Sequence, residues 1–131
     1  MAMTARKLVG RSDRVELGFL ESLRKRCAHH RLLLESLGEL YTKVGRYEDG
    51  LQVDLELTRL YPREALVWYN LGCSFALLSH KEEALAALAK AIDLGYVDAR
   101  WMCKDEDLES LREDPRFKIL IRRTSSGKVA R

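Results

Sequence analysis

The chain has 131 residues, of which 47% are hydrophobic and 33% charged, a size and balance that predict one globular domain with a modest core and no second domain. Its formal net charge of +3 combines basic ends with a slightly acidic body, which argues against a nucleic-acid-binding fold. Cys27, Cys73 and Cys103 lack the spacing of a disulfide scaffold, and neither a signal peptide nor a membrane-spanning run is recognisable, so we expect a cytoplasmic protein.

The first predicted elements are a tail and one helix. Residues 1–12 are small and basic, which predicts a disordered tail. Asp13 is suited to cap a helix that runs from Arg14 to about Cys27, with an apolar stripe formed by Leu17, Leu20 and Leu23. The domain is expected to span residues 13–123, with 13–28 as an N-terminal helix that corresponds to the second half of a preceding repeat.

Residues 31–64 and 65–98 are two copies of one 34-residue unit. Six positions are identical between them, namely Leu32/Leu66, Leu37/Leu71, Gly38/Gly72, Glu48/Glu82, Leu51/Leu85 and Leu60/Leu94. The spacing of apolar residues within each unit predicts two helices. The predicted ranges are about 30–44 and 47–60 in the first copy, and about 65–78 and 81–94 in the second. Glycine at matched mid-helix positions, Gly38 and Gly72, predicts helices so close that a Cβ would clash.

Residues 99–123 leave the repeat pattern and predict a helical cap over the last unit. Asp98 is suited to cap a short helix, and Asp114-Pro115 has the composition of a second helix start. The side chains expected to face inward from the second helix are those of Phe117, Leu120 and Ile121. Residues 124–131 predict a disordered basic tail.

At these residues the chain resembles the tetratricopeptide repeat family. The motifs that carry the resemblance are Leu37-Gly38, Tyr41, Gly50 and Pro62 in the first unit, and Trp68, Leu71-Gly72, Phe75, Ala84, Leu88 and Ala91 in the second. The segment from Leu94 to Phe117 is also similar to the closing segment of small bacterial members. The resemblance implies an all-α, right-handed solenoid of helical hairpins. It also implies that the first helices of the units line a concave groove that binds a protein or peptide.

The register of the repeat assigns the groove. The side chains assigned to it are Leu32, Glu35, Glu39, Thr42, Lys43, Leu66, Tyr69, Asn70, Cys73, Ala76 and Leu77. Members that clamp a chaperone's terminal carboxylate use cations there, whereas Glu35 and Glu39 would repel one. We therefore expect a partner segment with a lysine or arginine beside apolar anchors.

Asp54 interrupts the apolar pattern, since the matching residue of the second unit is Leu88. A carboxylate there needs a donor, and Asn70 or Tyr69 on the next helix is suited to supply it. Two interpretations stay open, a structural polar pair of Asp54 with Asn70 and a carboxylate that binds a ligand.

Other residues with chemical potential receive plainer interpretations. Cys27, His29 and His30 are too crowded for a closed zinc site and predict a polar helix junction. Cys73 is expected to be an inert thiol, and residues 104–109 an acidic, solvated surface. We expect no catalytic residues, no metal and no cofactor.

Three functions remain as hypotheses. The first is a non-enzymatic scaffold that docks a partner's peptide or helix. The second is a subunit that self-associates through an uncovered end of the solenoid, so that the chain is a monomer or a homodimer. The third is weak nucleic-acid contact through the basic tails, which predicts affinity that falls steeply with salt.

Overall fold

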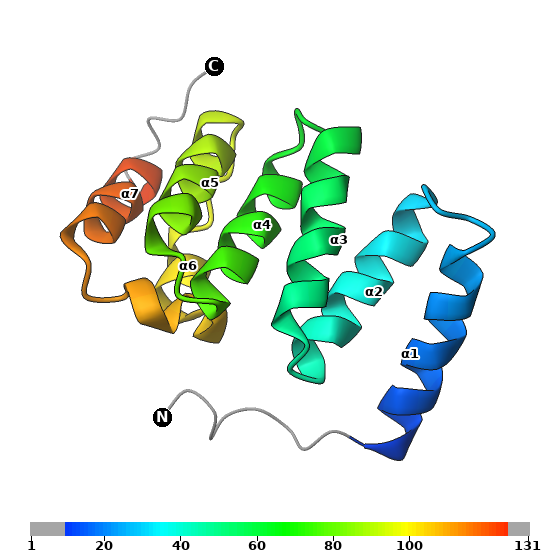
Figure 1. Ribbon diagram of the computed structural model, residues 1–131. Helices are drawn as coiled ribbons and strands as arrows, with labels where there is room; N and C mark the ends of the chain where they lie inside the picture. Colours follow the sequence, from blue (N-terminus) through cyan, green and yellow to red (C-terminus); the bar gives the residue numbers. More distant parts are fainter. Residues whose placement is uncertain (1–9, 126–131) are drawn as a thin grey trace.

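A computed structural model describes residues 10–125, and within that range all regular secondary structure is helical. The elements are α1 (Arg11–Arg24), α2 (Arg31–Lys43), α3 (Tyr47–Leu60), α4 (Ala65–Leu77), α5 (Lys81–Asp93), α6 (Ala99–Lys104), the 3₁₀ helix η2 (Glu106–Leu111) and α7 (Pro115–Ser125). Figure 1 shows α1 to α5 side by side in chain order, with α7 at the opposite end from α1. The prediction of an all-α protein is confirmed. None of the described helices combines the length and apolarity that crossing a membrane requires.

The four helices of the two sequence repeats lie where the periodicity predicts them, and each packs against the next along the chain. The turn after α2 contains Gly45 with φ +84°, and the matching turn after α4 contains Ser79 with φ +62°. Gly95 closes α5 with φ +113°, as expected of a residue just past a helix end. The matching turns give the two hairpins the same local path.

The core consists of two main clusters of buried apolar side chains. One lies among α1, α2 and α3, and its innermost members are Leu34, Leu37 and Val53. The other joins α4 and α5 to the C-terminal segment. It contains the α5 residues predicted to face inward, namely Ala84, Leu85, Leu88, Ala91 and Ile92. The C-terminal segment therefore belongs to the same folded unit as the second repeat.

The start of α1 differs from the prediction. The helix begins at Arg11, so the expected cap Asp13 lies inside the first turn, where its Oδ2 accepts the backbone N–H of Gly10 at 3.1 Å. Its Oδ1 lies 3.0 Å from Lys43 Nζ at the end of α2. Leu17 is buried against α2, but Phe19 is 61% exposed. Thus α1 covers the first repeat with one face and leaves apolar surface on the other.

The C-terminal segment forms as predicted up to α7. Asp98 Oδ1 accepts the N–H of Trp101 at 3.0 Å and caps α6, and Phe117 and Leu120 are buried. The predicted tail, however, begins too early, because Thr124 is buried within α7 and its hydroxyl donates to the Leu120 carbonyl at 2.9 Å. The remaining tail residues, 126–131, and residues 1–9 at the other end lie outside the described residues.

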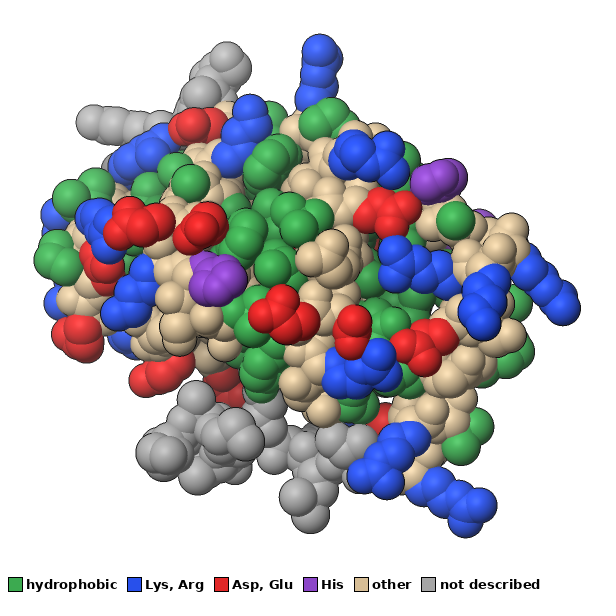
Figure 2. Space-filling view, in the orientation of Figure 1, with side chains coloured by type: hydrophobic (Ala, Val, Ile, Leu, Met, Phe, Trp, Pro, Cys, Tyr) green, Lys and Arg blue, Asp and Glu red, His purple; other side chains and the backbone are tan. Residues whose placement is uncertain are grey.

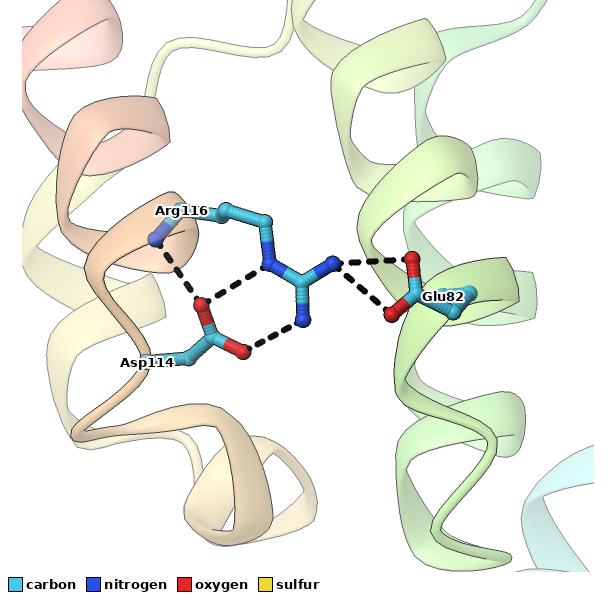
Figure 3. Close-up of polar contacts among 3 residues, drawn as sticks. All are labelled: Glu82, Asp114 and Arg116. Carbon is cyan, nitrogen blue, oxygen red and sulfur yellow. Dashed lines mark hydrogen bonds and ion pairs between the residues drawn. The ribbon is translucent and has the colours of Figure 1, made fainter.

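Arg116 of α7 forms an ion pair with α5. Figure 3 shows its guanidinium between Asp114, just before α7, and Glu82 in the first turn of α5. The nitrogen–oxygen distances are 2.8 Å to both Glu82 oxygens and 2.8 Å to Asp114 Oδ2. The hydrogen bonds from Arg116 lower the pKa of Asp114 to about 2. The side chains of Arg116 and Glu82 are solvent-exposed, so the ion pair between them contributes mainly to the orientation of α7.

The cap also keeps part of the repeat register. Leu108 in η2 follows Ser74 by one 34-residue repeat, and η2 packs against α4 while α7 packs against α5. The stretch that corresponds to a first helix is broken at Asp105, between α6 and η2. After this break η2 packs against α4, and Asp107 of η2 faces a space that residues of α2 and α4 also line.

Candidate functional site

A cleft of about 340 Å³ lies among α2, α3, α4 and η2. Much of the predicted groove lines it, namely Glu35, Glu39, Thr42, Leu66, Asn70, Cys73 and Leu77. Asp54 and Leu57 of α3 and Asp107 of η2 also line it. The structure therefore brings these predicted residues together, although the enclosing wall from η2 was not foreseen.

The other predicted groove residues lie elsewhere. Tyr69 and Ala76 are buried beneath the C-terminal segment rather than open to a partner. The Tyr69 hydroxyl donates to Asp105 Oδ2 at 2.6 Å, and the Ser110 hydroxyl donates to the Ala76 carbonyl at 2.9 Å. Leu32 is 66% exposed and does not line the cleft, and Lys43 pairs with Asp13. The prediction that Tyr69 and Ala76 line an open groove is wrong because η2 covers that part of α4.

Asp54 lies in the wall of the cleft with only 8% of its surface exposed. Its Oδ2 accepts the hydroxyl of Ser74 at 2.5 Å. The predicted partner Asn70 is exposed and lies one helical turn away on α4, so the pair of Asp54 with Asn70 is corrected to a pair with Ser74. One repeat further on, the corresponding residues are the fully buried Leu88 and Leu108, which shows that a polar pair replaces an apolar one here.

Burial raises the pKa of Asp54 to about 6. The hydrogen bond from Ser74 opposes this shift by favouring the ionised form, and the negative charge of Asp107 adds to it. The other titratable groups that line the cleft are Glu35, Glu39 and Cys73. Asp54 thus exchanges its proton close to neutral pH.

Asp54→Asn should stabilise the protein at pH 7.5 by about 1–3 kcal/mol and leave stability at pH 3.5 almost unchanged. Because the pKa of Asp54 is higher in the folded than in the unfolded chain, the folded chain holds more protons. The contribution of Asp54 to stability is therefore fully present below about pH 4 and is lost as the pH rises through 6. Urea unfolding at both pH values tests this, with Glu39→Gln as the control. A less stable Asp54→Asn at pH 7.5 would contradict it.

Asp105 was missed by the sequence interpretation, which assigned residues 104–109 to a solvated surface. Its side chain is buried, accepts the Tyr69 hydroxyl on Oδ2 and accepts the N–H of Asp107 on Oδ1 at 3.0 Å. The Asp105 carbonyl accepts a hydrogen bond from Arg112 at 2.8 Å. The signal in the sequence is an aspartate immediately before a short helical turn, a common capping position.

The ligand atoms of Cys73, Asp105 and Asp107 lie within 4.8 Å of one another. Burial raises the pKa of the Cys73 thiol well above its usual range, which disfavours the thiolate that a metal would need. The Asp105 carboxylate is already engaged by Tyr69 and the Asp107 amide. These contacts explain the cluster as the attachment of η2 to α4.

The junction between α1 and α2 is polar, as predicted from His29 and His30. His30 caps α2, and its Nδ1 accepts the N–H of Leu33 at 3.4 Å. His29 Nδ1 lies 3.1 Å from Glu56 on α3, and Arg24 of α1 contacts the same carboxylate at 2.7 Å. Cys27 is exposed. The junction is therefore held by an ion-pair network centred on Glu56.

Comparison with known proteins gives one partial match. The chain is 33% identical over 88 residues to a protein of Arabidopsis thaliana that is named as chloroplastic. The match covers 65% of this chain but only 26% of that protein, so the chain spans about a quarter of the length of this relative. No family model matches the chain, and no solved structure matches it.

Proposed function

We propose that the chain is a non-enzymatic protein–protein interaction module of the tetratricopeptide type. The proposal takes α2 to α5 as two stacked helical hairpins of a right-handed solenoid, with α1 as a half-repeat and residues 99–125 as a C-terminal cap. It is supported by the 34-residue sequence repeat, by the packing of each helix on the next, and by the matched turns at Gly45 and Ser79.

The observation that carries the functional part is the cleft itself. It collects side chains from both first helices, α2 and α4, and the exposed Leu66 of α4 is one of them. Leu32 is 66% and Leu66 58% exposed, at matching positions of the two repeats. Leu66 lines the cleft and Leu32 precedes its lining residue Glu35 by one helical turn, so the two leucines offer apolar contact area to a partner segment. The proposed partner is a protein or peptide, and its docking involves no chemical reaction and no cofactor.

Affinity capture from the source cell with the full chain tests the proposal. The double variant Leu32→Ser/Leu66→Ser should lose a captured protein that the wild type retains. Val97→Ser, which changes an exposed apolar side chain outside the cleft, should retain it. The purified partner should then bind the wild type directly and the double variant at least tenfold more weakly. Equal binding by both would contradict docking at this surface.

Self-association through α1 is a second candidate, favoured by the uncovered face of that helix. Val15 is 65% exposed and Phe19 61% exposed, beside a shallow hollow that Arg11 and Glu16 also line. Figure 2 shows one face of the molecule, on which apolar side chains reach the surface among mixed acidic and basic ones. A dimeric mass in solution that becomes monomeric in Phe19→Asp would support it. A monomeric wild type would contradict it.

The third hypothesis, nucleic-acid contact through the basic tails, concerns residues that lie mostly outside the described range. It stays a prediction of salt-dependent binding that disappears when residues 1–12 and 124–131 are removed. Because α1 starts at Arg11 and α7 includes Thr124, the truncation is better limited to residues 1–9 and 126–131.

A further inference from the structure

The wall of the cleft offers an accessible acceptor, one carboxylate oxygen of the otherwise buried Asp54. Asp54 uses Oδ2 to accept the hydrogen bond from Ser74, whereas Oδ1 accepts no hydrogen bond from residues 10–125. The side chain is 8% exposed and lines the cleft. This oxygen is open to the cleft, and a ligand that brings an N–H there could donate a hydrogen bond to it in place of water.

The carboxylates around Asp54 make the cleft negative. Glu39 and Asp107 line it together with Glu35. The basic side chains near it on α2 are engaged by carboxylates. Arg31 lies 2.9 Å from Glu35 and also pairs with Glu64, and Lys43 pairs with Asp13 at 3.0 Å. Among the described residues no cation pairs with Glu39. The cleft therefore favours a positively charged ligand.

The remaining walls are apolar and the space is small. Leu57, Leu66 and Leu77 line the cleft beside the carboxylates. A volume of about 340 Å³ is too small for a helix, which is roughly 10–12 Å across with its side chains. It is large enough for one long side chain. A lysine or arginine combines an apolar stem with a cationic end that donates several hydrogen bonds.

We propose that the cleft receives one arginine or lysine side chain from an extended segment of the partner. The cationic end lies among Asp54, Glu39 and Asp107, and the methylene stem packs against the leucines of the wall. The inference rests on the proposed function and narrows it, because it replaces a docked helix by an extended segment. It also gives η2 a direct role, since Asp107 comes from the C-terminal cap rather than from the repeats.

The test uses the full chain and two labelled, capped pentapeptides. One has a central arginine between two leucines, and the other has citrulline, which keeps the shape of arginine without its charge. Fluorescence anisotropy at 50 mM salt should show at least tenfold tighter binding of the arginine peptide. Its affinity should fall as salt rises, and it should increase from pH 5 to pH 7.5 as Asp54 loses its proton beside Glu35, Glu39, Asp107 and Cys73.

Variants locate the binding within the cleft. Glu39→Gln and Asp107→Asn should each weaken binding of the arginine peptide about tenfold, while their melting temperatures show that they remain folded. Glu83→Gln removes an exposed carboxylate of α5 that does not line the cleft, and it should bind like the wild type.

Three results would overturn the inference. They are equal binding of the two peptides, no binding of either up to 1 mM, and binding that needs an added divalent metal and is abolished by EDTA. The proposed function fails separately, in the capture experiment with Leu32→Ser/Leu66→Ser. A partner that depends on those leucines while the arginine peptide does not bind would reject the cationic pocket and leave the interaction module standing.

Discussion

Gly72→Ala should destabilise the protein by about 2–3 kcal/mol, because a methyl group at this position has no room. A Cβ on Gly72 would lie 2.8 Å from both Cγ and Cδ2 of Leu88, and 3.3 Å from the Ala84 carbonyl oxygen. Leu88 is fully buried on α5 and the Ala84 carbonyl belongs to the helix backbone, so neither group can move aside without a loss of stability. Urea unfolding at pH 7.5 measures the change in the free energy of unfolding.

Gly38→Ala is the matched control, since Gly38 holds the same position in the first repeat. Its Cβ would lie 3.4 Å from Asp54 Oδ1 and 3.6 Å from Val53, which is ordinary contact. The gain in helix propensity should then stabilise α2 by up to about 1 kcal/mol. If the two alanines had equal effects, or effects of the opposite order, the packing described for α2 on α3 and α4 on α5 would be wrong.

Asp105→Ala should destabilise the protein by about 2–4 kcal/mol and release η2 from α4. The substitution removes the side-chain cap of η2, worth about 1 kcal/mol. It also leaves the buried hydroxyl of Tyr69 without its acceptor, which costs a further 1–3 kcal/mol. Urea unfolding gives the total, and faster amide hydrogen exchange across residues 105–111 would locate the loss.

Two further variants separate these causes. Asp98→Ala removes the exposed cap of α6 and should cost only about 1 kcal/mol. Tyr69→Phe keeps the ring, which stacks on Tyr96 with centroids 4.4 Å apart, but removes the hydroxyl. If the hydrogen bond between Tyr69 and Asp105 is the main link between α4 and η2, the double variant Tyr69→Phe/Asp105→Ala should lose less stability than the sum of the two single variants. Additive effects would contradict that link.

The repeat in the sequence predicted most helix positions, because the apolar period and the turn residues agree. The expected range of α3 is the observed one, and Gly95 closes α5 as expected. The glycine argument was correct for Gly72 and wrong for Gly38. The difference is on the facing helix, where the small Asp54 stands in place of Leu88 and leaves room for a methyl group.

Register alone predicted the parts of the cleft that come from α2 and α4, since side chains one turn apart share a helix face. It could not predict Asp107 or the burial of Tyr69, because both depend on where η2 packs after the break at Asp105. An acidic stretch such as residues 104–109 is compatible with an exposed surface or with a capped turn. Only the contact with Tyr69 distinguishes the two.

The two ends of the helical row have different surfaces, and this limits how copies of the chain could assemble. The outer face of α1 presents Val15 and Phe19, whereas α7 exposes Lys118, Arg122 and Arg123 around a single isoleucine, Ile119. Head-to-tail stacking needs complementary surfaces at both ends and leads to rings or open filaments, while contact between two like surfaces closes on a twofold axis. Any association driven by α1 would thus stop at a pair, and raising the concentration would not extend it into a filament.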